Sequence, residues 1–201
     1  MNAVIIPARG GSKRIPRKNI RAFRGKPMIA WSIETALASQ VFDIVLVSTD
    51  DAEIADVSRL HGADVPFLRP AYLADDHIDT QTVIAHAIEW LQSNGTEPSI
   101  TACLYPTAPF IEADDLRAAI NKMEEDVTIE AVMAVGTFPS PIWRALELRN
   151  ERLERIYPEH EMTRTQDLPK TFYDAGQFYI ARTHRWLSKS DSVFSGAHPY
   201  H

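Results

Sequence analysis

The sequence contains a single cysteine, Cys103, among its 201 residues, so it cannot form an internal disulfide. Cys103 lies in the apolar run Thr101–Leu104, where a small core residue is expected rather than a nucleophile. No run approaches the roughly twenty apolar residues that a membrane span requires. The apolar start Met1–Ala8 lacks the basic segment of a signal peptide. These absences exclude a disulfide-stapled or membrane-spanning protein and predict a cytoplasmic one.

Acidic residues are also absent from positions 1–33, although the whole chain has a net charge of −6. The same positions hold eight cations: Arg9, Lys13, Arg14, Arg17, Lys18, Arg21, Arg24 and Lys26. The other 13 Lys and Arg share the rest of the chain with all 27 Asp and Glu. A local excess of cations in an acidic chain indicates a compact anion-binding site, and the acidic remainder argues against nucleic acid as a partner.

Apolar runs of strand length alternate with helical periodicity as far as residue 135. The strands are predicted at Ala3–Pro7, Asp43–Ser48, Val65–Leu68, Ile100–Tyr105 and Glu130–Val135. The helices are predicted at Pro27–Ser39, Asp51–His61, Asp79–Gln92 and Glu112–Met123. This order predicts an α/β fold with a mostly parallel sheet and helices on both faces.

The pattern breaks at Gly136, and residues 137–175 form an excursion rich in proline and mixed charge. Short alternating pieces at Ala145–Leu148 and Arg152–Ile156 favour a β-rich arm. A strand at Gln177–Ala181 and a short helix at Thr183–Ser188 then return the chain to the sheet. The whole chain, 1–201, is interpreted as one domain with this arm.

The loop after the first strand carries the strongest functional signal. Ala8–Asn19 combines Gly10 and Gly11 with five cations, and ligands of parallel α/β sheets bind beyond the carboxyl ends of the strands. Paired glycines let backbone N–H groups approach a phosphate. The loop matches neither the dinucleotide fingerprint nor the P-loop pattern, which argues against a dinucleotide oxidoreductase and an ordinary P-loop ATPase. The alternative interpretation is a flexible, solvated basic loop.

The segment Ile6–Asn19 (IPARGGSKRIPRKN) resembles the opening motif of the CMP-sialic acid synthetases and related sugar nucleotidyltransferases. Further matches follow in order: Val47–Asp51, Phe67–Pro70, Leu73–Asp76, Pro106–Pro109, Arg164 and Leu168–Phe172. The resemblance runs from Ala3 to about Ile180. It implies a Rossmann-like three-layer sandwich of the nucleotide-diphospho-sugar transferase type, in which the arm forms a homodimer.

One subgroup of this family fits better than the others. Tyr105 precedes Pro106–Pro109 where the sialic acid enzymes tend to have Gln, and the block Asp174–Tyr179 resembles the subgroup that activates pseudaminic acid. Replacing polar groups at a sugar pocket changes which hydroxyl and acyl groups are recognised. The resemblance therefore implies pseudaminic acid as the acceptor, with sialic acid or another keto-acid sugar as the alternative.

The resemblance implies transfer of CMP from CTP to the anomeric hydroxyl of a nine-carbon keto-acid sugar, with release of pyrophosphate. Three residues are expected to be catalytic, holding the triphosphate and the reacting α-phosphate: Arg9, Lys13 and Lys18. The remaining nucleotide-binding residues are expected to be Ala8, Gly10, Gly11, Ser12, Asn19, Arg69 and Thr80. The sugar is expected to contact Tyr105, Arg164, Asp174 and Gln177.

Several of these residues have simpler interpretations. Arg69 would equally suit a surface ion pair, and Arg164 a salt bridge within the arm. Asp174 and Gln177 would suit a turn before Gly176. Asp50 and Asp51 end the second strand; a cap for the next helix is favoured for Asp51.

The expected cofactor is Mg²⁺, which the family binds with an Asp-x-Asp pair after its last strand. That pair is absent from this sequence, which ends at His201, and the C-terminal end of the family domain is expected to be missing. The metal ligands are therefore not assigned, and recruitment of the metal by an aspartate elsewhere, such as Asp174, stays open. Two other interpretations stay open: a glycosyltransferase with a similar nucleotide-binding half, and a truncated homologue that binds nucleotide with weak or no turnover.

Overall fold

The computed structural model describes residues 1–75 and 77–201, in two compact units. The first unit, called here the body, comprises Met1–Ala134 and Gly176–Tyr200. The second, called here the arm, comprises Val135–Ala175 together with His201. Each unit is described by itself.

A six-stranded sheet runs through the body in the order β10-β6-β9-β5-β1-β4. The strands are β1 (Asn2–Pro7), β4 (Ile44–Ser48), β5 (Ile100–Leu104), β6 (Ala131–Thr137), β9 (Phe172–Arg182) and β10 (His198–Tyr200). Strand β1 pairs in parallel with β4 and β5, and β10 with β6, whereas β9 is antiparallel to β5. The mostly parallel α/β sheet expected from the sequence is confirmed.

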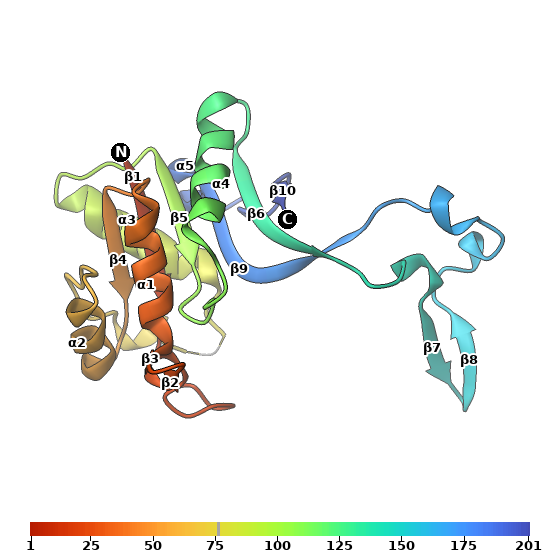
Figure 1. The fold of residues 1–201 in the computed structure, drawn as a ribbon, viewed down its shortest axis with the longest axis horizontal. Helices are drawn as coiled ribbons and strands as arrows, with labels where there is room; N and C mark the ends of the chain where they lie inside the picture. Colours follow the sequence, from red (N-terminus) through yellow and green to blue (C-terminus); the bar gives the residue numbers. More distant parts are fainter. Residues whose placement is uncertain (76) are drawn as a thin grey trace. The chain divides into compact units, whose positions relative to one another are not determined.

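Helices cover both faces of this sheet (Figure 1). Helices α1 (Met28–Ser39) and α4 (Ala113–Glu125) pack together on one face, with α2 (Ala52–Leu60) beside α1. Helices α3 (Thr80–Ser93) and α5 (Thr183–Leu187) pack together on the other. The three layers expected for the fold are therefore present.

Alternation along the strands divides the core between the two faces, because successive strand residues point to opposite sides. Ala3 and Ile5 of β1 belong to one buried cluster with Ile84 and Ile88 of α3 and with Trp186 of α5. The indole N–H of Trp186 donates to the carbonyl of Thr101 at 2.9 Å, so this large ring is buried with its polar atom satisfied.

Cys103 lies in the same cluster and is fully buried. Burial raises the pKa of its thiol far above the ordinary value, so no thiolate forms at physiological pH. The expectation of a core cysteine is confirmed.

The chain after α5 is fastened to α3 by one side chain. The amide nitrogen of Gln81 donates to the carbonyl of Ser188 at 2.8 Å, and its amide oxygen accepts from the backbone of Val193 at 3.0 Å. Both ends of one amide thus bind the segment that leads to β10.

Three predictions of secondary structure need correction. Val65–Leu68 is not a strand: Asp64 and Leu68 each form one isolated bridge, with Leu46 of β4 and with Thr49, and Pro66 between them lacks the N–H that a ladder needs. Strand β9 begins at Phe172, five residues earlier than predicted. The three-residue strand β10 was not predicted, because it is too short and carries Pro199.

A second small feature missed from the sequence is the hairpin of β2 (Ala22–Phe23) and β3 (Lys26–Pro27) before α1. Arg24 and Gly25 between these strands both have positive φ, at 48° and 89°. Such a turn suits a two-residue hairpin, but Arg-Gly is not among its common sequences.

The arm contains an antiparallel hairpin of β7 (Leu146–Arg149) and β8 (Arg152–Arg155), close to the two short strands predicted there. Asn150 and Glu151 turn the chain with positive φ. Leu168 is the one buried residue among Val135–Ala175. Large apolar side chains of the arm are exposed, namely those of Leu146, Leu148, Leu153 and Met162.

Candidate active site

A cavity of about 760 Å³ opens in the body at the carboxyl ends of β1 and β5, as ligand sites of parallel sheets do. Three segments line it: the loop after β1, the stretch from Arg69 to Val83, and the turn after β5. Eight residues predicted from the sequence meet in this lining: Arg9, Ser12, Lys13, Lys18, Asn19, Arg69, Thr80 and Tyr105. Residues far apart in sequence therefore form one site.

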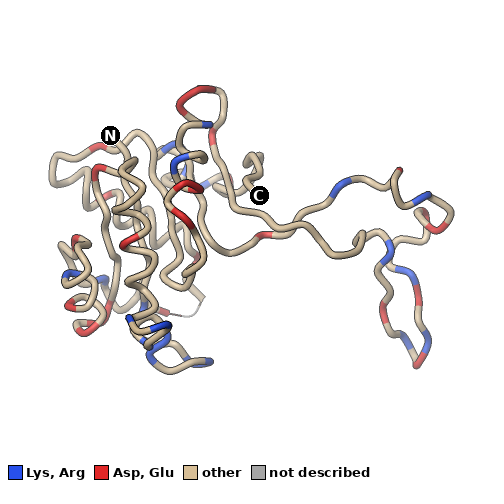
Figure 2. Tube along the Cα trace, viewed as in Figure 1, with Lys and Arg blue, Asp and Glu red and all other residues tan. Residues whose placement is uncertain are grey.

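Positive charge dominates this cavity. Arg9, Lys13, Arg14, Lys18 and Arg69 contribute to the lining, against Asp75 as the one carboxylate among the described lining residues. Figure 2 shows the cations of the loop and of the hairpin after it gathered at this end of the body. Partial burial, with Arg14 and Arg9 nearby, lowers the pKa of Lys18. Such a concentration of cations suits a polyanion.

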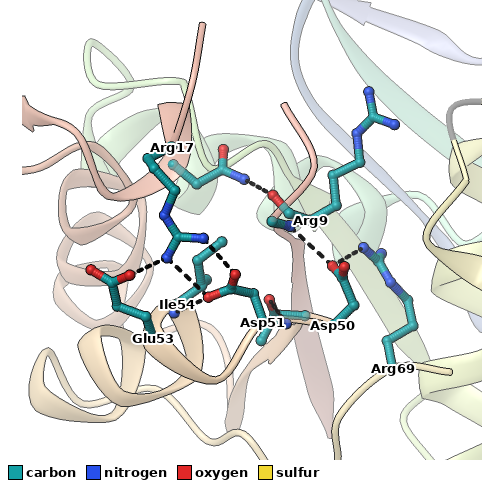
Figure 3. Close-up of polar contacts among 10 residues, drawn as sticks. Arg9, Arg17, Asp50, Asp51, Glu53, Ile54 and Arg69 are labelled. Atoms are coloured by element: carbon teal, nitrogen blue, oxygen red, sulfur yellow. Dashed lines mark hydrogen bonds and ion pairs between the residues drawn. The ribbon is translucent and has the colours of Figure 1, made fainter. Parts of the chain in front are cut away.

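The far end of the loop is fixed by Arg17, whose backbone is left-handed with φ of 53°. Its guanidinium bridges the carboxylates of Asp51 and Glu53 (Figure 3), with Nη2 3.1 Å from Asp51 Oδ1. The Arg17 guanidinium lowers the pKa of Asp51. The carboxylate of Asp51 also accepts from the backbone of Ile54 at 3.0 Å. The predicted cap of α2 by Asp51 is confirmed, and the same residue anchors the loop.

The near end of the loop is held by its backbone. Ala8 is buried and donates to the carbonyl of Ser48 at 2.9 Å, and Gly10 donates to Asp50 Oδ1 at 3.0 Å. A Cβ at Gly10 would lie 2.6 Å from Asp51 Oδ2. Neither residue lines the cavity, nor does Gly11. In this structure the Gly10 N–H is therefore occupied by Asp50.

Asn19 is buried below the loop at 4% exposure. Its amide nitrogen donates to the carbonyl of Arg9 at 2.9 Å, whereas its amide oxygen has no hydrogen-bond partner among the described residues. Because buried polar atoms are rarely left unsatisfied, this oxygen is suited to accept from a bound ligand or water.

Arg69 is buried at 5% exposure, so its interpretation as a surface ion pair is wrong. Its Nη2 lies 3.5 Å from Asp50 Oδ1, and its Nε has no partner among the described residues (Figure 3). Burial lowers the pKa of Arg69 while Asp50 opposes the shift. One donor of the buried guanidinium is therefore unused among the described residues.

Thr80 begins α3, and its hydroxyl lies 3.0 Å from the hydroxyl of Tyr105 at the end of β5. The ring of Tyr105 meets Tyr179 edge-on, with centroids 5.6 Å apart. These contacts fix the Tyr105 ring as a wall of the cavity. Apolar wall residues that the sequence did not single out are Ile15, Leu73, Ile78 and Val83.

The other predicted sugar contacts are divided between the two units. Gln177 binds Tyr105 through its backbone, as acceptor from the Tyr105 N–H at 2.9 Å, and does not line the cavity. Arg164 and Asp174 belong to the arm. Arg164 is 73% exposed in its side chain and pairs with Asp167 at 2.7 Å, as its simpler interpretation predicted.

The described residues do not fit a magnesium site on their own. Asp75 is exposed and accepts from the backbone of His77, and no group of three His, Cys, Asp or Glu side chains converges in the described ranges 1–75 and 77–201. Asp76, which belongs to the Leu73–Asp76 match, lies outside the described residues.

No helix in the described part of the chain is long and apolar enough to cross a membrane.

The chain is similar in sequence to known enzymes that form CMP-sugars. Residues 3–191 match the family described as Cytidylyltransferase. Pseudaminic acid cytidylyltransferase of Campylobacter jejuni is 44% identical over 194 residues, covering 96% of this chain and 83% of that protein. CMP-N,N'-diacetyllegionaminic acid synthase of Legionella pneumophila is 40% identical over 141 residues, covering 69% of this chain and 60% of that protein.

Solved structures support the fold. A CMP:2-keto-3-deoxy-manno-octonic acid synthetase complexed with CTP superposes with a TM-score of 0.68 at 20% identity, covering 92% of this chain and 76% of that one. The matched range and the identity to the Campylobacter protein span nearly the whole sequence, cavity included. The chain belongs to the cytidylyltransferase family.

Proposed function

We propose that this chain transfers CMP from CTP to the anomeric hydroxyl of pseudaminic acid, a nine-carbon keto-acid sugar, and releases pyrophosphate. The observation that carries the proposal is the cationic cavity at the ends of β1 and β5, in a chain that is 44% identical to a pseudaminic acid cytidylyltransferase. The reaction would take place in the cytoplasm.

The triphosphate would lie against the loop after β1. Arg9, Lys13 and Lys18 line the cavity and would neutralise its charge, with Ser12 as a hydrogen-bonding group. The sugar hydroxyl oxygen forms a bond to the α-phosphorus as the bond to the bridging oxygen breaks, pyrophosphate leaves, and the hydroxyl proton passes to solvent. Such a displacement depends mainly on positioning and on stabilising the developing charge. Lys18 is assigned to the reacting phosphate.

The cytidine would lie toward Arg69 and Thr80, with the free amide oxygen of Asn19 as a further acceptor. A buried guanidinium with an unused donor suits the acceptor atoms of a pyrimidine. Ala8, Gly10 and Gly11 would act by shaping the loop rather than by direct contact.

The sugar would contact Tyr105, whose ring is fixed by Thr80 and Tyr179. Gln177 holds the backbone of Tyr105 and would orient it. Arg164 and Asp174 of the arm remain proposed contacts for the carboxylate and polar groups of the sugar, supplied in a homodimer.

Mg²⁺ is proposed as the cofactor on the family relationship alone. A bound magnesium ion would stabilise charge on the phosphates. No residue is assigned to it, because the described residues provide one carboxylate in the cavity lining.

The reaction is tested by following pyrophosphate release from CTP and Mg²⁺ with pseudaminic acid, and with sialic acid in a parallel reaction. We expect release with pseudaminic acid only. Release with sialic acid instead would replace the proposed sugar. CTP binding without release from either sugar would favour a nucleotide-binding homologue without turnover, and consumption of an intact nucleotide-sugar would favour a glycosyltransferase.

Homodimerisation through the arm is supported by the exposure of Leu148 at 71% and Leu153 at 68% on one hairpin. Exposed apolar patches of this kind mark interfaces. Light scattering at micromolar concentration should give a dimer, and the double substitution Leu148→Asp with Leu153→Asp should give a monomer. The matched control is Glu147→Gln with Glu154→Gln on the same hairpin. A monomeric wild-type chain would contradict the proposal.

A further inference from the structure

One carboxylate of the body contacts two elements of the cavity at once. Asp50 follows β4, and its Oδ1 accepts from the N–H of Gly10 at 3.0 Å while lying 3.5 Å from Nη2 of Arg69 (Figure 3). Gly10 belongs to the loop after β1, and Arg69 lines the cavity from another segment. A single oxygen atom therefore links these two elements.

Arg69 depends on this carboxylate. Its side chain is 3% exposed, and a buried guanidinium without a counter-charge is strongly unfavourable. The other fixed contact of the residue is its backbone N–H, which donates to the carbonyl of Thr49 at 2.7 Å. Asp50 is therefore the group that orients the charged end of Arg69 and leaves its Nε free.

The neighbouring Asp51 performs a different task. Its carboxylate is engaged by Arg17 and by the backbone of Ile54, and it closes against Gly10 from the other side. It fixes the loop to α2 without contacting Arg69. Both carboxylates therefore hold the loop, and Asp50 is the one of the two that also contacts Arg69.

We propose that Asp50 is a positioning residue that couples the phosphate-binding loop to Arg69, so that the phosphates and the base of one nucleotide are held at a fixed separation. This inference rests on the proposed nucleotide site. It goes beyond that proposal because it assigns the discrimination between pyrimidine bases to a residue that does not line the cavity.

The charge and the hydrogen bond of Asp50 can be separated by substitution. Asp50→Asn keeps an oxygen that can accept from Gly10 but removes the charge that orients Arg69. Asp50→Ala removes both. The coupling therefore predicts that the asparagine variant damages base recognition selectively, whereas the alanine variant damages base and phosphate recognition together.

The test measures binding of CTP, UTP and inorganic triphosphate by calorimetry, with amide hydrogen exchange at Gly10. Asp50→Asn should weaken CTP binding by about 10- to 100-fold, the range for losing a hydrogen bond to a charged group, and should reduce the preference for CTP over UTP. Its affinity for inorganic triphosphate and its Gly10 exchange should stay near wild type. Asp50→Ala should also weaken triphosphate binding and speed Gly10 exchange. Asp56→Asn, an exposed carboxylate on α2, is the matched control.

A merely structural role would lower affinity for all three ligands equally and leave the ratio of CTP to UTP unchanged in Asp50→Asn; that result overturns the inference while the proposed function stands. A wild-type chain that binds no nucleotide overturns the proposed function and the inference with it. Restoration of the base preference in Asp50→Glu, together with loss in Asp50→Asn, supports the coupling.

Discussion

The body and the arm place their large apolar side chains in opposite ways. In the body, leucine, isoleucine and tryptophan are packed between the sheet and its helices, and Ile84, Ile88 and Trp186 are at most 1% exposed. In the arm, Leu148, Leu153 and Met162 are at least 68% exposed. The body thus covers these core side chains itself, whereas these side chains of the arm are left exposed.

The same contrast applies to charge. Five cations of the body line one cavity, and Lys18 and Arg69 among them are partly or fully removed from water. Cations of the arm form local pairs, as Arg164 does with Asp167 and Arg155 with Glu161. Exposed local pairs contribute little energy. The body thus gathers cations at a cavity, whereas the arm carries exposed ion pairs.

Truncation in the core should give the largest difference between the units. Ile84→Ala should reduce the free energy of unfolding by about 2–5 kcal/mol, because it leaves a cavity between α3 and the sheet. Leu153→Ala should change the unfolding of the body by less than about 0.5 kcal/mol and act on dimer association instead. Denaturant titrations with light scattering measure both. Equal losses in unfolding free energy would remove the distinction.

Removing a cation of the cavity should give the next largest effect, on kcat. Lys18→Ala should lower kcat by about 10²–10³-fold, the effect of deleting one group that stabilises transition-state charge. Pyrophosphate release measures this, and unchanged thermal unfolding shows that the fold is intact. Lys189→Ala, an exposed lysine of the body, is the control. A greater loss from Arg164→Ala in the arm would place the chemistry there and reverse the comparison.

Within the body, the two adjacent glycines of the loop differ in the space around them. Gly10→Ala should cost about 1–3 kcal/mol through overpacking, because its new Cβ would meet Asp51 Oδ2 at 2.6 Å. CTP affinity should fall with it, since the loop must shift. Gly11→Ala is the matched control, because its Cβ meets nothing within 4 Å. Equal effects at the two glycines would show that the loop is not held as described.

The smallest expected effect is a pH dependence confined to the cavity. The pKa of Lys18 lies below the usual 10.5, and a bound phosphate raises it again. CTP affinity should therefore be full below the lowered pKa and decline as pH rises through it, by at most about tenfold per unit for one proton. Calorimetry across alkaline pH measures the slope. Lys18→Arg should flatten it, and an equal slope in that variant would assign the proton elsewhere.

Most of the fold and much of the cavity were predictable from the sequence because their signals are local. Buried parallel strands such as Ile44–Ser48 give continuous apolar runs, and Ile84, Ile88 and Leu91 give a clear helical period. The cavity followed from one topological rule, since Arg9 and Tyr105 come directly after parallel strands.

The features that the sequence did not reveal depend on contacts between residues far apart in the chain. The burial of Arg69 could not be inferred, because its counter-ion Asp50 lies 19 residues away in sequence. The use of the Gly10 N–H by Asp50 spans 40 residues and leaves no periodic signal. Strand β10 forms only because β6 offers it an edge. Such features arise from the assembled sheet, and no local pattern encodes them.

The solitary Cys103 has a practical consequence for separating the two units by experiment. Because the thiol is 0% exposed in the middle of the sheet, a thiol-reactive dye added to the folded chain can label it only when the body opens. The rate of labelling therefore measures how often the sheet opens. A cysteine introduced at an exposed arm position outside the hairpin, such as Glu159, would react at once, so a fluorophore can be attached to the arm alone without removing any native residue of the body.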